Sequence, residues 1–500
     1  MLAVLQFDAV SVPRIEQLLD QGRLPNLAAL RARGRWVDLE STAANFPAAA
    51  YATLYSGVDI ADHGLYYAFQ WSPGHQRVRW RGDFPQPLMI WERVARAGKR
   101  TLVIDPYECI EPHLANGVAV AGYQLVNVMS LPRWSTPRSA AKQLDRLFGA
   151  PRFVNEVFGR PNARGLLELR RRLLDATERV TEAAVHLLRR DAYDLVWVNM
   201  LAGHLGGHMF WDLSQVDSRL LDDATRTTLS AALDDIYELM DAGLGRIVAE
   251  LPAADIVVTA PIGMGVNISR VDLLPAMLEA VLSSNGEART ESRAERFVWN
   301  LRGAVPTSAR AKVASALHGP LTRELTMRLS SLGVDWDKTP AFMLPSDHFG
   351  QVRLNIRGRE RQGIVEGAEA GELVERIRAG LTSFREADGT QTAVAVDATR
   401  DLVGDGPFVD LLPDVVVKWS DTPAHGIDRV SSPAHGEVRR PGTGSGRSGA
   451  HTPYAWALLA PTSLDYAEPE LPHILDIAAT VCAALGVEAD GLPGRPLLAA

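Results

Sequence analysis

Two histidines in the stretch GHLGGHMFWD, residues 203–212, are the first candidates for chemistry. His204 and His208 stand four residues apart beside glycines, directly after an apolar run. Imidazole nitrogens are common ligands of transition metals, and this spacing can serve one metal ion. An isolated pair of this kind is nevertheless more often structural, so the pair by itself does not predict a metal site.

The elements around these histidines follow a strand–helix–strand rhythm. An apolar run at 2–8 precedes a helical pattern and then strand-like residues at 35–40. Further strand-like runs follow helical stretches at 101–105, 194–200 and 255–260. This alternation predicts an α/β fold with a mostly parallel central sheet and helices on both faces.

The carboxyl ends of the predicted parallel strands should form one rim. Asp8, Asp105, and the loops that follow Met200 and Ala260 all lie directly after such strands. Ligands of open parallel sheets bind outside the carboxyl ends of the strands, so we expect the functional site there.

The strand rhythm stops between 266 and 345, where the chain is rich in helical patterns and charges. We interpret this segment as an inserted helical cap, between a first core part at 1–265 and a second at 346–500. Strand character returns at 351–358 and 413–419. Residues 421–450 are dense in Gly, Pro and Ser and predict a long surface loop.

The composition narrows the class of protein. The chain has 500 residues, 46% of them hydrophobic, and a net charge of -8, which disfavours a nucleic-acid binder. Cys109 and Cys482 are the two cysteines, too few for a disulfide framework or a thiolate zinc cluster. The N-terminus does not read as a signal peptide, and no apolar run is long enough to span a membrane. We expect a soluble cytoplasmic protein with a small-molecule partner, no nucleic-acid or membrane partner, and a homodimer as an open option.

An ordered series of stretches resembles a known family. LQFDAVSVPRIEQLLDQGRLPNLAALRARG, YATLYSGVDIADHGL, DLVWVNMLAGHLGGHMFW, DIVVTAPIGMG and GAHTPYAWALLAP resemble the type I phosphodiesterase/nucleotide pyrophosphatase branch of the alkaline phosphatase superfamily. The resemblance implies an alkaline-phosphatase-like fold. It also implies two metal ions, usually zinc, and a Thr or Ser nucleophile that displaces a phosphoryl or sulfuryl group.

The first metal site of that family is mostly missing here. Its opening aspartate matches Asp8, but the nucleophile falls on Pro47, which has no oxygen to attack with. The Asp and His of a later Asp-His-Gly motif match Pro261 and Ile262, and an asparagine that holds the phosphoryl oxygens matches Ala68. These positions cannot bind metal as the family does.

The second metal site is changed rather than lost. Its family ligands, an aspartate and two histidines, match His204, His208 and His451. Three imidazoles make a plausible pocket for one divalent ion, with zinc first and iron, cobalt or copper as alternatives. Open positions would remain for water or substrate.

Several other residues have candidate roles with alternatives. Asp8 could be an acid, a base, a group that orients a histidine, or purely structural. Arg447 could hold an anionic substrate. Asn45 could bind substrate, although capping the following helix is the simpler interpretation. His348 could line the cavity or lie at the surface, and a structural role is simpler for His63.

Together these residues predict a mononuclear metal enzyme. We expect hydrolysis or elimination on a small anionic metabolite, through metal-bound water or metal-bound substrate, rather than ordinary phosphodiester hydrolysis. One alternative is a metal-free pseudoenzyme that acts as a binding or scaffold protein. Another is a redox enzyme with a three-histidine iron or copper centre.

Overall fold

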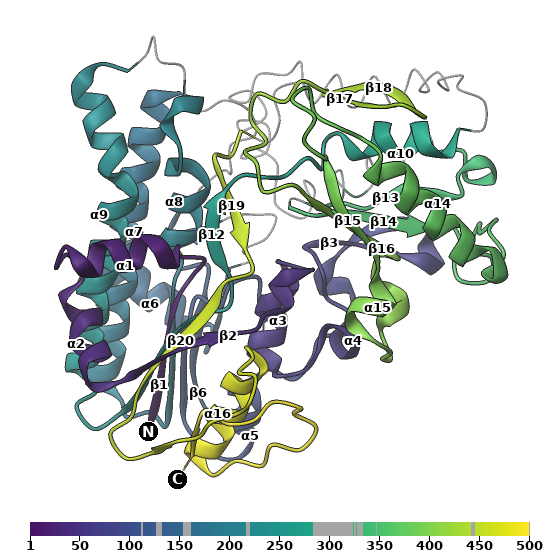
Figure 1. Ribbon diagram of the computed structural model, residues 1–500. Coiled ribbons are helices and arrows are strands. Elements are labelled where there is room, and N and C mark those ends of the chain that lie inside the picture. Colours follow the sequence, from purple (N-terminus) through teal and green to yellow (C-terminus); the bar gives the residue numbers. More distant parts are fainter. Residues whose placement is uncertain are drawn as a thin grey trace.

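An eight-stranded sheet forms the centre of the molecule (Figure 1). The computed structural model describes residues 1–111, 114–126, 133–153, 162–216, 221–283, 324, 327, 334–346, 348–441 and 446–499. The strand order is β2-β20-β11-β1-β10-β5-β6-β8. The strands are β1 (Leu2–Phe7), β2 (Arg35–Leu39), β5 (Thr101–Ile104), β6 (Gly117–Ala121), β8 (Trp134–Thr136), β10 (Leu195–Met200), β11 (Asp255–Ala260) and β20 (Ala455–Ala460).

The central strands of this sheet are parallel. β11, β1, β10, β5 and β6 run in one direction, whereas β20 is antiparallel to β11 and to β2, and β8 is antiparallel to β6. β1, β10 and β11 are buried along their whole length, which explains their near-continuous apolar sequences. The predicted mostly parallel α/β sheet is therefore confirmed.

Helices cover both faces of the sheet, as predicted. In Figure 1, α7 and α9 pack side by side on one face, and α3, α5 and α16 lie on the other. The helices of this unit are α1 (Val12–Asp20), α2 (Pro25–Arg33), α3 (Ala49–Ser56), α5 (Ile90–Arg96), α6 (Ser139–Phe148), α7 (Ala163–Arg190), α8 (Ala202–Phe210), α9 (Asp223–Ala249) and α16 (Leu475–Leu485).

A second, smaller sheet lies beside this unit. The strands expected within 351–358 and 413–419 are present, but they belong to this antiparallel sheet, with order β13-β14-β16-β15, and it has its own buried apolar cluster. Its elements are β13 (Ala341–Met343), β14 (Gly350–Leu354), β15 (Ala393–Ala398), β16 (Val415–Trp419), α10 (Leu274–Leu282) and α14 (Ala370–Thr382). Most of the predicted cap, 284–333, falls outside the described residues, so its helical nature and the proposed division at 266 and 345 stay predictions.

The long surface loop predicted for 421–450 is wrong in part. Strands β17 (Arg429–Ser432) and β18 (Gly436–Arg439) form a hairpin, followed by β19 (Gly449–Thr452), which pairs with β12 (Gly263–Val266). Val430 and Val438 are buried within the hairpin while most of their neighbours are exposed. That alternation is a strand pattern, although the Gly, Pro and Ser content of the segment obscures it.

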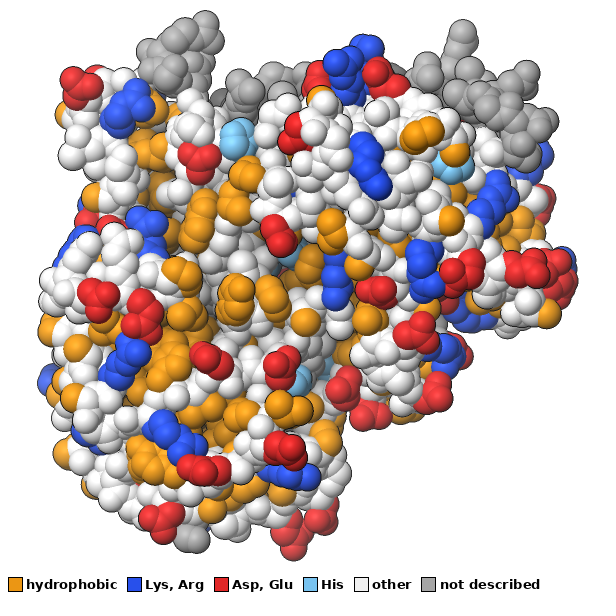
Figure 2. Space-filling model, in the orientation of Figure 1, with side chains coloured by type: hydrophobic (Ala, Val, Ile, Leu, Met, Phe, Trp, Pro, Cys, Tyr) orange, Lys and Arg blue, Asp and Glu red, His pale blue; other side chains and the backbone are white. Residues whose placement is uncertain are grey.

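The surface carries charges of both signs. Figure 2 shows Lys and Arg interspersed with Asp and Glu over the face in view. In the parts of the chain that the structure describes, no helix combines the length and apolar character that crossing a bilayer requires.

A buried ion pair joins the second sheet to the hairpin of β3 (Phe69–Ser72) and β4 (Arg77–Trp80). The side chains of Arg353 and Glu360 are fully buried, and their charged atoms lie 2.7 Å apart. The other carboxylate oxygen of Glu360 accepts a hydrogen bond from Trp71 Nε1 at 2.7 Å. Removing one partner of such a pair leaves an uncompensated buried charge.

We therefore expect Glu360→Ala to lower the free energy of unfolding by about 3–5 kcal/mol. The matched control is Glu375→Ala, which breaks an exposed pair with Arg378 on α14 and should cost less than about 1 kcal/mol. Urea unfolding of the two variants measures the difference. Equal losses would show that the buried pair does not stabilise this sheet.

Candidate metal centre

Three buried histidines converge at the carboxyl end of the central sheet. His204 and His208 lie on α8, which begins directly after β10, and His451 lies on β19 near the other end of the chain. Their ring centroids are 4.7–5.0 Å apart, and one nitrogen from each ring lies within 4.8 Å of the others. In the described ranges they form the one group of this kind.

Glycines bring these elements together. A Cβ atom on Gly449 would lie 2.2 Å from the carbonyl oxygen of Gly207, and one on Gly207 would lie 2.5 Å from Met264 Cγ. The backbones of α8, β12 and β19 can therefore pack this closely only without side chains at these two positions. The backbone N–H of Ser448 donates to the His208 carbonyl at 2.9 Å and fixes the contact.

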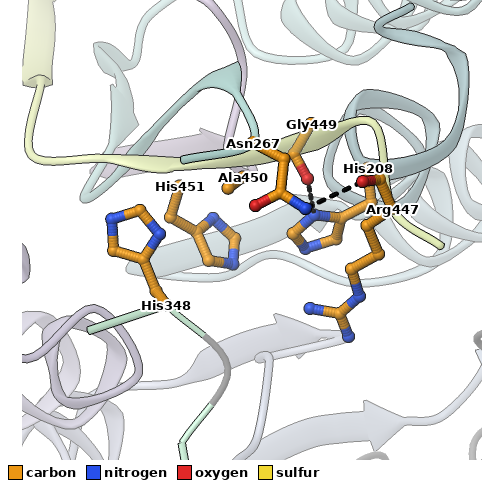
Figure 3. A pocket seen from close by; sticks show the side chains of 7 residues that line it. All are labelled: His208, Asn267, His348, Arg447, Gly449, Ala450 and His451. Carbon is orange, nitrogen blue, oxygen red and sulfur yellow. Dashed lines mark hydrogen bonds between the residues drawn. The ribbon is translucent and has the colours of Figure 1, made fainter. Parts of the chain in front are cut away.

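Hydrogen bonding sets the orientation of His208. Its Nδ1 lies 2.9 Å from the carbonyl oxygen of Gly449 and must carry the proton to donate to it (Figure 3). The Nε2 of His208 and the Nδ1 of His451 are buried without a hydrogen-bond partner in the protein. Each of these two nitrogens is therefore free to bind a ligand.

Burial keeps the rings of His208 and His451 neutral. Burial holds the pKa of His208 well below its usual 6.5, and the nearby charge of Arg447 adds to the effect. Burial also holds the pKa of His451 well below that value, with smaller contributions from His204 and His348. Neutral imidazole is the form that binds metal.

His204 is held from the opposite side. Its Nδ1 lies 3.1 Å from Asp8 Oδ2, at the end of β1, and 3.1 Å from the hydroxyl of Tyr51 on α3. Asp8 is fully buried. The burial of Tyr51 raises the pKa of its hydroxyl well above 10, and the charge of Asp8 adds to this effect. A histidine that donates one ring N–H to a carboxylate presents its other nitrogen to a metal.

These residues fit a single divalent ion. Three imidazoles converge, two of their nitrogens lack any protein partner, and the rings of His204 and His208 are each oriented through Nδ1. Zinc bound by histidine lies about 2.0–2.1 Å from each nitrogen, so binding would draw the three rings slightly together.

A small pocket opens beside the cluster (Figure 3). It is lined by His208, Asn267, His348, Arg447, Gly449, Ala450 and His451. Arg447 and His348 thus lie at the site, as their proposed roles require, whereas Asn45 is not among the lining residues. Asn267 was not predicted from the sequence. It directly follows β12, whose four residues, GMGV, are too few and too rich in glycine to be recognised as a strand.

The cap predicted for Asn45 is wrong, and Asp105, which follows β5 at the predicted rim, has a structural role. Asn45 does not cap the helix that follows it, because α3 starts at Ala49 and its N-cap residue is Ala48, without a side-chain cap. The carboxylate of Asp105 is not directed to the histidines. It accepts hydrogen bonds from the backbone N–H groups of Tyr123 and Gln124, at 2.7 and 2.6 Å, and so holds the chain after β6.

Apart from Asp8, the positions that match the nucleophile, the other ligands and the phosphoryl-binding residue of the family are occupied by buried residues without metal-binding side chains. Pro47, Ala68, Pro261 and Ile262 are all buried. Ser41 donates to the carbonyl oxygen of Pro261 at 2.7 Å, which ties this segment to the protein interior.

Comparison with known proteins identifies the family of the chain. The pattern of the type I phosphodiesterase/nucleotide pyrophosphatase family matches residues 2–399. The chain belongs to this family. No curated protein matched it.

A solved structure agrees in fold. Phosphonoacetate hydrolase from Sinorhizobium meliloti, in complex with phosphonoformate, is similar with a TM-score of 0.50 and 14% identity, over 97% of this chain and 95% of that one. The murine ectonucleotide pyrophosphatase/phosphodiesterase 5 in complex with AMP has a TM-score of 0.47 and 11% identity, over 100% of this chain and 99% of that one. The alkaline-phosphatase-like fold expected from the sequence is confirmed.

His63, close to α3, has a structural environment, as expected. Its Nδ1 accepts a hydrogen bond from the backbone N–H of Leu65 at 3.0 Å, so its Nε2 donates to Thr53 Oγ1, also at 3.0 Å. Burial, with a smaller contribution from Arg81, lowers the pKa of His63 from 6.5 to about 3. The unfolded chain therefore takes up this proton at a higher pH than the folded chain.

This difference predicts a loss of stability in acid. The free energy of unfolding should fall as the pH drops from 6.5 towards 3, by about 4–5 kcal/mol for this residue at most. A His63→Asn variant should be less stable than wild type at pH 7, and the gap should narrow as the pH falls. Urea unfolding over a pH series tests this, with the exposed His75→Asn as control. A constant gap between wild type and His63→Asn would contradict the prediction.

Proposed function

We propose that this chain is a metal-dependent enzyme with a mononuclear site, in which His204, His208 and His451 hold one divalent transition-metal ion. The reaction is hydrolysis or elimination on a small anionic metabolite. The observation that carries the proposal is the convergence of three buried imidazoles, two of which have ring nitrogens without a protein partner. Membership of a family named for hydrolytic activities supports an enzyme.

The chain's own residues prepare the site. Asp8 accepts the Nδ1–H of His204 and so fixes the ring and its tautomer. This contact favours an orienting role for Asp8 over a role as a ligand. The other oxygen of Asp8, Oδ1, is buried without a hydrogen-bond partner, so it is also free to accept a proton. A bound divalent ion would supply a Lewis acid that polarises substrate and activates water.

An anionic substrate fits the charge of the pocket. Arg447 lies close enough to His208 and His451 to lower the pKa of both, so its charge acts directly beside the cluster. His348 reaches the same pocket from the second sheet. A guanidinium can bind a carboxylate or phosphate through two parallel hydrogen bonds.

Ordinary phosphodiester hydrolysis with two ions is not part of the proposal. Pro47 has no oxygen for nucleophilic attack, and Pro261 and Ile262 cannot replace an aspartate and a histidine as ligands. We propose zinc as the ion, with iron, cobalt or copper as the alternatives that three imidazoles also accept. A cytoplasmic location stays a prediction.

The metal content of the full chain, purified without chelator, tests the proposal. We expect about one ion per chain in wild type by elemental analysis. In His204→Ala the content should fall several-fold, because three ligands become two. The matched control is His425→Ala, which removes an exposed histidine and should keep the wild-type metal content.

Each outcome separates the alternatives. A metal content far below one ion per chain in wild type would overturn the proposal and favour a metal-free binding protein. Full retention of metal in His204→Ala would show that the ligand set is wrong. Stoichiometric iron or copper in place of zinc would favour redox chemistry.

A further inference from the structure

The pocket beside the histidines is built for a small, charged group. Four of its seven lining residues carry cationic or imidazole side chains, and the others are Asn267, Gly449 and Ala450. The enclosed space of this pocket is about 10 Å³, which admits an oxygen-sized group but is too small for a nucleobase.

Asn267 links the two walls of this pocket. Its Nδ2 donates to the carbonyl oxygen of Arg447 at 2.8 Å, and its backbone N–H donates to that of Ser448 at 3.0 Å. Its Oδ1 accepts from the backbone N–H of Ser269 at 2.9 Å, which fixes the side chain. The backbone of Arg447 is thereby held at a set distance from the end of β12.

Asn267 is itself anchored by the second sheet. Arg270, three residues later, is fully buried and pairs with Glu386 at 2.7 Å. Its guanidinium also donates to the carbonyl oxygen of Ser420 at 3.1 Å and to Thr422 Oγ1 at 2.7 Å. The backbone N–H of Ala424 donates to the carbonyl oxygen of Asn267 at 2.8 Å. The segment 267–270 therefore connects the end of β12 and Arg447 to the residues that follow β16.

We infer that the pocket takes a small oxyanion, a phosphate, phosphonate or carboxylate group without a nucleobase, and that Asn267 is a positioning residue that places Arg447 for it. The inference rests on the proposed function, since it names the substrate class of the same site. Asn267 acts through its hydrogen bond to the backbone of Arg447, so its loss lets the guanidinium move away from the cluster. The three histidines do not depend on this bond.

Binding of inorganic phosphate to the cobalt-loaded full chain tests this inference. Phosphate should change the visible absorption of Co²⁺, and AMP should need at least a ten-fold higher concentration for the same change. In Asn267→Ala, the metal content and the anion-free absorption should match wild type, while the phosphate concentration for half the change rises about ten-fold. Asn116→Ala is the matched control, because it removes a similar amide-to-carbonyl bond, to Gly98, at an exposed position.

Two results would overturn the inference: AMP binding more tightly than phosphate, or unchanged phosphate affinity in Asn267→Ala. If that variant fails to fold, Asn267→Ser keeps an oxygen for the Ser269 N–H but loses the Nδ2 amide that donates to the Arg447 carbonyl, and it should show the same loss. If wild type binds no metal, the proposed function fails. The stabilisation of the metal-free chain by phosphate, measured by thermal unfolding in wild type and both variants, then tests Asn267 separately.

Discussion

The close approach of α8 to β19 is the contact on which the histidine cluster depends. At Gly207 and Gly449 any side chain would overlap backbone or Met264 atoms, so the two elements meet backbone to backbone. The resulting bonds, from Ser448 N–H to the His208 carbonyl and from His208 Nδ1 to the Gly449 carbonyl, fix both the distance and the tautomer. His451, two residues beyond Gly449, is carried to within contact of a helix that lies more than two hundred residues earlier in the chain.

The charges at this rim agree with the single ion that we propose. A second divalent ion needs anionic or imidazole ligands, and Pro261 and Ile262 stand where the resemblance places an aspartate and a histidine. Asp8 is the one aspartate of that site that remains. Its Oδ2 lies 3.1 Å from His204 Nδ1, and its carboxylate also interacts with Tyr51. His204 stands where the resemblance places an aspartate ligand, so the three proposed ligands include no carboxylate. With the proposed ion bound and Arg447 beside it, such a site would favour an anionic substrate.

The central unit and the unit of the second sheet have separate apolar clusters, and both contribute residues to the pocket. His348 comes from the second sheet, while His208 and His451 belong to the central unit. Their arrangement is held by polar links across the junction, such as the bonds of Arg270 and Asn267. Such buried polar contacts are directional, so they define a geometry that apolar packing alone would leave adjustable.

The sequence by itself determined the parallel sheet, because strands buried on both faces must be apolar throughout, and it determined His204 and His208 as a candidate pair through their spacing. Together with the family resemblance, the sequence also identified His451 as a candidate ligand and indicated that most of the first metal site is missing. Only the tertiary structure decided that 350–354 and 415–419 form a second sheet, because a short apolar strand has the same sequence pattern in either one. Only the tertiary structure revealed Asn267 and excluded Asn45 as a cap, since both depend on hydrogen bonds between distant or irregular segments that no local pattern encodes.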